Sequence, residues 1–166
     1  MSEPMTLAGG SRCLRSVLGR FATGVVAVAG CDPVTGGRAG LVANSFCSVS
    51  LDPPLVSFCV AHTSTSWPAI RAAGLLAISI LGAQQREAAR RLAVSGGDKF
   101  GGLPWLGSPG GAPVLEGALA WLECAVEAEY PAGDHMIVVA RVLRLDALQE
   151  GEPLLFFRGA FERLDR

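Results

Sequence analysis

A chain of 166 residues, half of them hydrophobic, is long enough to fold as one domain around its own core, and we expect that domain to span residues 11–166. The formal net charge of −1 and the lack of a strongly basic cluster argue against a nucleic-acid-binding surface. Charged residues make up only 17% of the chain, which is low for a free-standing monomer and hints at surface buried in an oligomer.

The N-terminus and the cysteines indicate the compartment. Residues 1–10 have the composition of a disordered lead and contain no apolar segment typical of a signal peptide. No apolar run approaches the length that spans a bilayer. The five cysteines are odd in number and form no C-x-x-C pair, which fits neither a disulfide framework nor a zinc site. We therefore expect a cytoplasmic protein in which Cys59 and Cys124 are buried in apolar strands.

The first predicted element is an amphipathic helix that Ser11 can cap. Its apolar face carries residues at helical spacing: Leu14, Val17, Leu18 and Phe21. A buried strand follows over 25–29, and the chemistry of 32–37 is typical of a hairpin turn.

The stretch 40–60 combines a polar opening with an almost unbroken apolar close. Residues 55–60 read as a buried strand, and the prolines of Asp52-Pro53-Pro54 force a turn before it because they lack a backbone N–H. We expect two strands joined through a polar segment that contains Ser48 and Ser50. Its N–H groups and hydroxyls suit the edge of a flat heterocycle or a phosphate; alternatively, they hydrogen-bond their own turn.

Hydroxyl-bearing residues gather before a short helix predicted over 67–73. Ser66 is placed to cap this helix, Pro68 falls in its first turn, and Gly74 ends it. With His62, the free N–H groups and hydroxyls have the ingredients of an anion site, although the same hydroxyls can serve only as caps.

A strand over 75–81 and a helix over 83–93 lead into a Gly/Pro-rich loop at 95–113. A loop of this length in a compact domain is more often functional than decorative. Phe100 and Trp105 can instead anchor it in a hydrophobic crevice.

The last third of the chain is predicted to be strands. Residues 119–130 and 135–145 form two of them around a tight turn at 131–134, and a further strand is expected at 153–157. Many strands, short turns, few helices and no alternation of strand with helix predict a mainly β, antiparallel barrel with a few added helices.

Residue patterns for self-contained catalysis are not visible. Neither histidine lies near a G-x-S-x-G motif, no His/Cys/carboxylate cluster stands out, and the glycines of 36–40 link two strands rather than opening a helix as in a Rossmann fold. Glu123 and Glu127 lie on a predicted strand and could face solvent, so we assign them no role. What remains is a hydrogen-bonding pocket for a cofactor with its own reactivity.

Three motifs carry a resemblance to a known family. Residues 44–56 read NSFCSVSLDPPLV and closely resemble the NSFTSVSLDPPLV signature of the flavin reductase-like family, with Phe21-Ala-Thr-Gly24-Val25 before it and Gly133-Asp134-His135 after it. Members are the reductase components of two-component flavin monooxygenases. The resemblance implies a Greek-key-like split β-barrel of the FMN-binding type, a homodimer, and an NAD(P)H:flavin oxidoreductase. It would use FMN, or else FAD, with NADH or NADPH, and pass reduced flavin to a separate monooxygenase.

The resemblance also implies where the cofactors bind. The implied cofactor-binding residues are Val42, Ala43, Asn44, Ser45, Ser48, Val49, Ser50, Ala61, His62, Thr63, Ser66, Trp67, Lys99, Phe100, Gly133, Asp134 and His135. His135 is the implied catalytic residue, because in the family the Gly-Asp-His triplet lies on the nicotinamide side of the flavin.

The chain departs from the family pattern at three positions. Val42 replaces a common Thr or Ser, Cys47 a Thr, and Ala140 a frequent Gly, which bears on cofactor preference more than on reaction type. Two other readings remain: a flavin-binding split barrel without turnover, and an oxidase of a small substrate such as a pyridoxamine phosphate. The Gly-Asp-His triplet favours the reductase, and the lack of a basic phosphate cluster counts against the oxidase.

Overall fold

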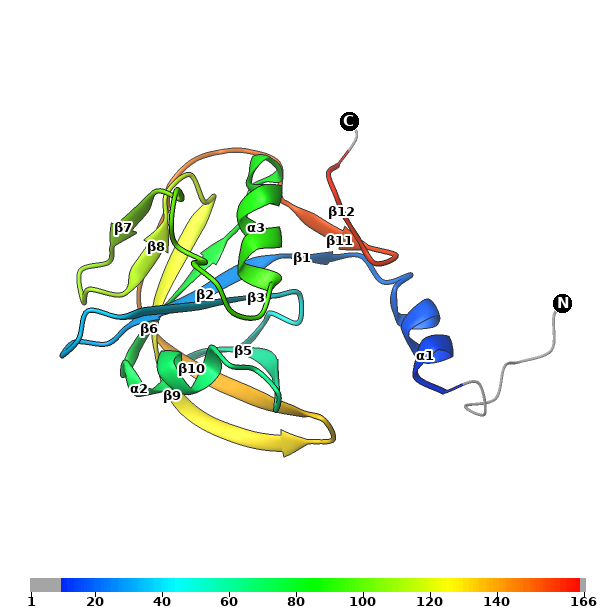
Figure 1. Cartoon of the computed structure of the whole chain (residues 1–166), viewed down its shortest axis with the longest axis horizontal. Helices are drawn as coiled ribbons and strands as arrows, with labels where there is room; N and C mark the ends of the chain where they lie inside the picture. Colours follow the sequence, from blue (N-terminus) through cyan, green and yellow to red (C-terminus); the bar gives the residue numbers. More distant parts are fainter. Residues whose placement is uncertain (1–9, 165–166) are drawn as a thin grey trace, which may run out of the picture.

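The computed structural model describes residues 10–164. Positions 1–9 of the expected disordered lead lie outside the described residues. Gly10 does not belong to a lead but begins helix α1, Gly10–Leu18. Figure 1 shows that this helix stands away from the rest of the molecule.

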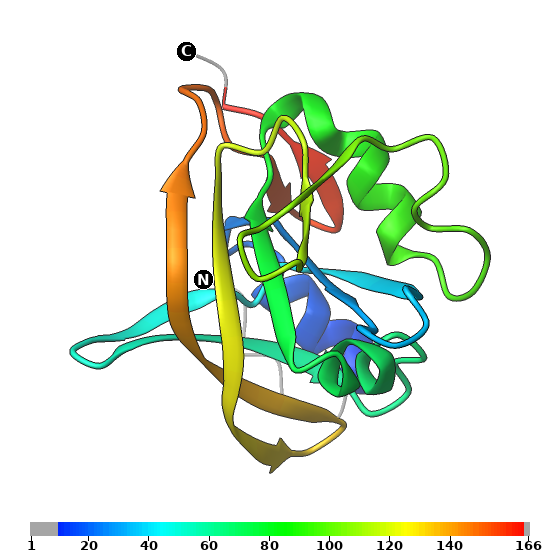
Figure 2. The same ribbon diagram turned by 90° about the vertical axis from the view of Figure 1, so that its left-hand side faces the viewer.

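A seven-stranded antiparallel sheet forms the body of the protein, in the strand order β3-β2-β6-β9-β10-β5-β4. Its strands are β2 Val26–Cys31, β3 Arg38–Ala43, β4 Cys47–Leu51, β5 Pro54–Ala61, β6 Leu75–Ile80, β9 Ala120–Ala132 and β10 His135–Ala147. Figure 2 shows β9 and β10 as two long strands that bend together around the molecule. The predicted mainly β, antiparallel architecture is confirmed, but β3 and β4 are the edges of the main sheet, which does not close into a barrel by hydrogen bonding.

Helices and two small sheets complete the fold. The remaining elements are β1 Thr23–Gly24, α2 Trp67–Ala72, the 3₁₀ turn η2 Ala83–Gln85, α3 Arg86–Ala93, β7 Trp105–Gly107, β8 Pro113–Leu115, β11 Leu155–Phe157 and β12 Ala160–Glu162. β1, β11 and β12 form one small sheet, and β7 and β8 form the other. No helix within residues 10–164 is long and apolar enough to cross a bilayer.

The stretch 40–60 contains three strands rather than the two expected. Residues 47–51 form β4, which pairs with β5 around a cis Asp52–Pro53 peptide, so Ser48 and Ser50 lie on an edge strand and not in a connecting segment. The apolar/polar alternation of Cys47-Ser-Val-Ser-Leu51 fits a strand with two different faces, a pattern that the serines alone obscured.

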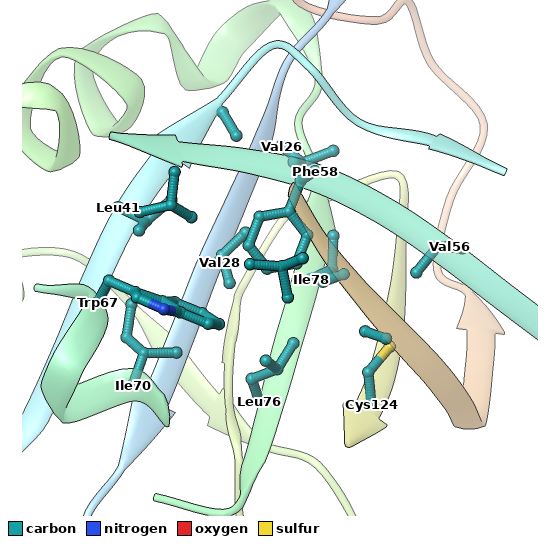
Figure 3. Packing of buried hydrophobic residues seen from close by; sticks show 14 residues of the cluster. Val26, Val28, Leu41, Val56, Phe58, Trp67, Ile70, Leu76, Ile78 and Cys124 are labelled. Carbon is teal, nitrogen blue, oxygen red and sulfur yellow. The ribbon is translucent and has the colours of Figure 1, made fainter. Parts of the chain in front are cut away.

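The buried core lies on both faces of β2. Val26 and Val28 pack into the larger cluster, whereas Ala27, with Val25 just before the strand, packs beneath α3. In the larger cluster the Trp67 ring meets Phe58 edge-on, with centroids 5.7 Å apart (Figure 3). This contact seats α2 against the sheet and thereby fixes the chain segment that precedes it.

Helix α1 buries none of its side chains against the described chain. The predicted apolar face exists but is exposed: Leu14 by 45%, Val17 by 55% and Leu18 by 61%, with Phe21 beyond the helix by 76%. An amphipathic helix ordinarily packs its apolar face against another part of the protein. Within residues 10–164, no other element covers the apolar face of α1.

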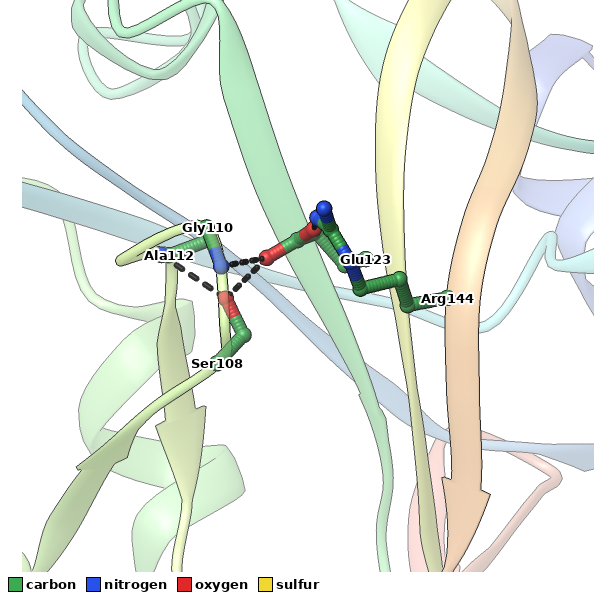
Figure 4. Close-up of polar contacts among 5 residues, drawn as sticks. All are labelled: Ser108, Gly110, Ala112, Glu123 and Arg144. Atoms are coloured by element: carbon green, nitrogen blue, oxygen red, sulfur yellow. Dashed lines mark hydrogen bonds and ion pairs between the residues drawn. The ribbon is translucent and has the colours of Figure 1, made fainter.

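The expectation that Glu123 faces solvent is wrong. Its side chain is fully buried beneath the loop that β7 and β8 flank, where Oε2 accepts from Gly110 N at 2.6 Å and from Ser108 Oγ, and Oε1 pairs with Arg144 (Figure 4). Burial raises the pKa of Glu123, but these donors outweigh it and hold the pKa below the ordinary glutamate value. Burial, with the Glu123 charge, also raises the pKa of Cys124 to about 12.

Candidate functional site

A cavity of about 350 Å³ lies where β3, the end of β5 and the segment before α2 meet. We call it the main cavity. It brings together nine of the predicted site residues: Val42, Ala43, Asn44, Ser45, Ala61, Thr63, Ser66, Lys99 and His135. It is also lined by residues that were not predicted: Leu41, Cys59, Val60, Ser64, Thr65, Leu92, Ala93 and Ser95.

The wall between β3 and β5 is held by Ser45. Strand β4 begins at Cys47 opposite Ser57, so the backbone of Cys59 extends beyond the β4 ladder. The Cys59 N–H instead donates to Ser45 Oγ at 2.8 Å. Ser45 therefore joins the two strands, and Cys59 is half-buried in the cavity wall rather than in the core.

Lys99 brings an uncompensated charge to the main cavity. It is the only lysine of the chain, and its Nζ donates to Gly40 O at 3.2 Å, Ser66 Oγ at 3.0 Å and Leu92 O at 3.1 Å. All three acceptors are neutral, and no carboxylate within residues 10–164 forms an ion pair with it. Burial lowers its pKa. A cation in this position favours an anionic ligand group.

The segment before α2 differs from the expected cap. Ser66 occupies the cap position, but its hydroxyl accepts from Lys99 and makes no cap bond. Ser64 takes that role, because its Oγ accepts from Trp67 N at 3.2 Å. The Ser66 hydroxyl thus lies beside the ammonium group, where it can also donate to an anion.

Trp67 belongs to the core, not to the main cavity. Its Nε1 donates to Glu129 Oε1 at 3.0 Å, and Glu129 Oε2 pairs with Arg71 Nε at 2.8 Å. This pair of contacts ties both the first and the last turn of α2 to β9. Trp67 therefore acts on the cavity by fixing the position of the preceding segment.

His135 is the first residue of β10 and lines the main cavity. Its Nδ1 lies 2.7 Å from Asp134 Oδ1, and this contact is the main cause of a lowered Asp134 pKa. Gly133 has a φ of +63° and forms the two-residue turn with Asp134, while Pro131 and Ala132, expected in the turn, extend β9. Asp134 can therefore fix one ring nitrogen of His135 and leave the other for a ligand.

The remaining predicted residues do not line the main cavity. Ser48, Val49 and Ser50 lie on edge strand β4. His62 stands in sequence between the lining residues Ala61 and Thr63, but it is exposed, and its backbone N–H donates to Asp134 O at 3.0 Å. Phe100 packs against Trp105, with ring centroids 4.5 Å apart. This contact agrees with the alternative that the two aromatic residues anchor the loop.

The chemistry of the main cavity is binding rather than self-contained catalysis. Within residues 10–164, no group of His, Cys, Asp or Glu side chains is arranged to hold a metal. The volume lies within the range of roughly 300–1,000 Å³ that small-molecule sites occupy. Hydroxyls, an amide, backbone groups and one ammonium fit a flavin: donors for the polar edge of its ring and a cation for its phosphate.

Comparisons with known proteins agree with this chemistry. The family described as "Flavin reductase like domain" matches residues 18–165. The reductase subunit HsaB of a flavin-dependent monooxygenase of Rhodococcus jostii is 39% identical, covering 93% of this chain and 78% of that protein. An FMN reductase (NADH), SmoA, of Agrobacterium fabrum is 42% identical, covering 99% and 94%.

A solved structure extends the likeness to three dimensions. The NADH:FAD oxidoreductase SgcE6 of Streptomyces globisporus, in complex with NAD and FAD fragments, matches with a TM-score of 0.89 and 37% identity, covering 99% of this chain and 98% of that one. A match of the family over nearly the whole chain, with relatives of this identity, leaves one assignment: the chain belongs to the flavin reductase-like family.

Proposed function

We propose that this protein is an NAD(P)H-dependent flavin reductase that supplies reduced flavin to a separate monooxygenase. The observation that carries the proposal is the main cavity, whose lining combines Lys99, an uncompensated cation, with hydrogen-bonding groups and His135, while its lining residues include no metal-binding set and no pair of acids. Such a site binds and orients reactants that carry their own reactivity.

The residues of the cavity divide by the group each would hold. Lys99 and Ser66 would bind the flavin phosphate, and Asn44 with the β3–β5 wall would bind the pyrimidine edge of the ring. When bound, the flavin supplies the hydride acceptor and the reduced nicotinamide supplies the hydride. His135 would orient the nicotinamide, with Asp134 fixing its ring. Orientation of two reactants can account for roughly 7–11 kcal/mol of a barrier.

FMN is our first choice of flavin and NADH of nicotinamide. SmoA is named an FMN reductase (NADH), and SgcE6 an NADH:FAD oxidoreductase, so both flavins occur among similar proteins. The terminal phosphate of FMN carries more negative charge than the same phosphate within the pyrophosphate of FAD. Lys99 has no other counter-ion among the described residues. This favours FMN.

We infer a homodimer from the surface of α1. Leu14, Val17 and Leu18 of α1 and Phe21 just beyond it are exposed, and α1 stands apart from the body (Figure 1). A second copy would cover them, as the low charge fraction of the chain led us to expect. Sedimentation at micromolar concentration should give one species of twice the chain mass, and Val17→Glu should shift it to the monomer. A monomeric parent protein would contradict the inference.

The partner and the compartment follow from the same proposal. HsaB is a reductase subunit of a flavin-dependent monooxygenase, and we expect an enzyme of that class to receive the reduced flavin here. All five cysteines are free thiols, which supports a cytoplasmic location.

The proposal is tested by steady-state oxidation of NADH and NADPH with and without FMN and FAD. We expect NADH oxidation that depends on added flavin, with the lower KM for FMN. A protein that binds FMN but oxidises neither nucleotide above the rate of the free components would instead be a flavin-binding protein without turnover, the second candidate, and would overturn the proposal.

A further inference from the structure

Glu129 reaches from the sheet to both turns of α2. It lies on β9 beyond Ala125, where the pairing of β9 with β6 ends. Its Oε1 accepts from Trp67 Nε1 at 3.0 Å, and its Oε2 pairs with Arg71 Nε at 2.8 Å. The Trp67 side is buried, whereas the Arg71 side chain is 63% exposed and its ion pair is largely solvated. The bond to Trp67 is therefore the stronger of the two links.

The Glu129 side chain lies on the core face of the sheet. Phe58 of β5 stands opposite Val138 of β10, and Val138 stands opposite Glu129. Residues that are directly opposite share a face, and both Phe58 and Val138 are fully buried. A carboxylate at the end of such a row loses hydration that a hydrocarbon side chain would not have to give up. What an acid gains at this position is its contact with α2.

Helix α2 depends on such contacts, because a helix of six residues is not stable by itself. Its middle lies directly on β2, where a Cβ atom added to Gly30 would come within 3.1 Å of Ile70 Cα. This close approach fixes one point of the helix but not its direction. The contacts of Trp67 with Phe58 and Glu129 fix a second point at the first turn (Figure 3). Together the two points set the direction in which α2 faces the main cavity.

The first turn of α2 carries a wall of the main cavity with it. Ser66 directly precedes Trp67, and its Oγ lies 3.0 Å from Lys99 Nζ. The Trp67 backbone N–H also donates to Ser64 Oγ at 3.2 Å. Protein hydrogen bonds are strong over a narrow range of roughly 2.7–3.2 Å. A small shift of this turn therefore takes Ser66 Oγ out of the geometry in which it and Lys99 can hold the same anion.

We propose that Glu129 is a positioning residue for the anion-binding wall. Through Trp67 it aligns Ser66 with Lys99, and it thereby sets the preference of the main cavity for a flavin that carries a phosphate. The inference rests on the proposed function, in which Lys99 and Ser66 bind that phosphate. Glu129 does not itself line the main cavity, so it acts through α2.

Two substitutions of Glu129 separate its hydrogen bond from its size. Glu129→Leu removes the acceptor and keeps a side chain of similar volume, whereas Glu129→Gln keeps an oxygen for the Trp67 N–H. The matched control is Glu127→Leu, which removes an acid of the same strand whose partner is Arg141 and not α2. The dissociation constants of FMN and of riboflavin are measured by fluorescence titration. Their ratio reports the contribution of the phosphate, and a role in stability alone would leave this ratio unchanged.

We expect Glu129→Leu to weaken FMN binding about tenfold and riboflavin binding by less than about twofold. Glu129→Gln should bring the FMN constant back to within about threefold of the parent value, since the indole bond is kept. Glu127→Leu should stay within about twofold for both ligands. In a Lys99→Met background Glu129→Leu should add less than about threefold, because residues that act through a shared group are not additive.

Trp67→Phe tests the same bond from the helix. Phenylalanine keeps an aromatic ring against Phe58 and removes the N–H donor, so FMN binding should weaken by about fivefold and riboflavin binding should not change. This variant decides the matter if Glu129→Leu does not fold, as judged by circular dichroism.

Three results would overturn the inference: equal weakening of FMN and riboflavin, unchanged FMN binding, or full additivity with Lys99→Met. Failure of the proposed function looks different. The expected affinities in a protein that does not oxidise NADH or NADPH would reject the reductase and leave the role of Glu129 in place. A parent protein that binds riboflavin as tightly as FMN would reject the phosphate assignment of Lys99 and Ser66, and this inference with it.

Discussion

Lys99 lines the main cavity, and Glu123 is buried beneath the loop between β7 and β8. The protein compensates the charge of Glu123 but not the charge of Lys99. The Glu123 carboxylate is fully buried and receives an arginine, a hydroxyl and a backbone N–H. The Lys99 ammonium donates only to neutral oxygens. A buried charge that the chain compensates by itself is costly to leave without its partners, whereas a charge left uncompensated beside a cavity indicates a ligand.

The largest effect that would separate the two regions is expected for Glu123→Ala. Loss of the carboxylate leaves the Gly110 N–H and the Ser108 hydroxyl without their acceptor and Arg144 without its partner. The free energy of unfolding should fall by about 3 kcal/mol. Urea unfolding measures it, with an unchanged m-value as the sign of an intact two-state reaction.

The matched control lies on the same strand. Glu127 pairs with Arg141 at 2.7 Å, but both side chains are 40% exposed, so Glu127→Ala should cost less than about 1 kcal/mol. Equal losses for the two variants would show that burial of Glu123 contributes nothing.

The pH dependence of stability should carry the same signature. The pKa of Glu123 is lower in the folded than in the unfolded protein, so its contribution is fully present above the ordinary glutamate value and is lost as the pH falls through the lowered pKa. Glu123→Gln should therefore flatten the acid limb of the stability curve. An acid limb identical to that of the parent protein would contradict this role.

Lys99→Met is the corresponding test of the main cavity. Methionine keeps the apolar stem and removes the ammonium, so the FMN dissociation constant should rise about 30-fold, equivalent to about 2 kcal/mol for charge-assisted hydrogen bonds to phosphate. Stability without flavin should stay within about 1 kcal/mol of the parent protein, because no ion pair is broken. Riboflavin, which lacks the phosphate, is the control ligand, and its affinity should not change. A destabilised variant with unchanged FMN binding would show that Lys99, like Glu123, serves the stability of the fold and not ligand binding.

Asn44→Ala tests a neutral side chain of the main cavity. Asn44 is exposed and lines this cavity. Loss of its amide would leave a polar group of the ligand unpaired, and the flavin dissociation constant should rise about tenfold, or about 1.4 kcal/mol. Fluorescence titration of FMN measures it. An unchanged constant with a native circular dichroism spectrum would remove Asn44 from the site.

His135→Ala should have the smallest effect on binding and be visible mainly in turnover. Flavin affinity should stay within about threefold, while kcat/KM for the reduced nicotinamide falls about tenfold, or about 1.4 kcal/mol. Asp134→Asn keeps a hydrogen-bond partner for the His135 ring but removes the negative charge. Its kcat/KM should lie between the values of the parent protein and of His135→Ala. Lost flavin affinity with full turnover at saturating flavin would reverse the assignment of the two faces of the cavity.

Local sequence predicted the parts of the site whose polarity is unusual for their position. Residues 43–45, Thr63 and Ser66 carry small or polar side chains next to apolar strands, and they line the main cavity, as do Ser64 and Thr65, which were not predicted. Leu92, Ala93 and Ser95 also line it, but nothing in an ordinary amphipathic helix marks its last turn as a cavity wall. Only the packing of α3 against distant β3 brings these residues there.

Glu123 escaped prediction for a related reason. Alternation along β9 puts it on the same face as the exposed Glu127, and a strand pattern alone makes both solvent-facing. The register places Glu123 opposite Ala77 of β6, at the part of the sheet that β8 and its loop cover. Whether a polar residue on a strand is exposed thus depended on a loop whose position the sequence did not specify.

The single lysine also has a consequence for chemistry in solution. Apart from the α-amino group, an amine-directed reagent finds one target in the whole chain, and that target lines the main cavity. Because burial lowers its pKa, a larger share of this amine is neutral and nucleophilic at a given pH than in an exposed lysine. The rate of acylation or reductive methylation at Lys99 therefore reports whether the cavity is filled, without a label having to be engineered into the protein.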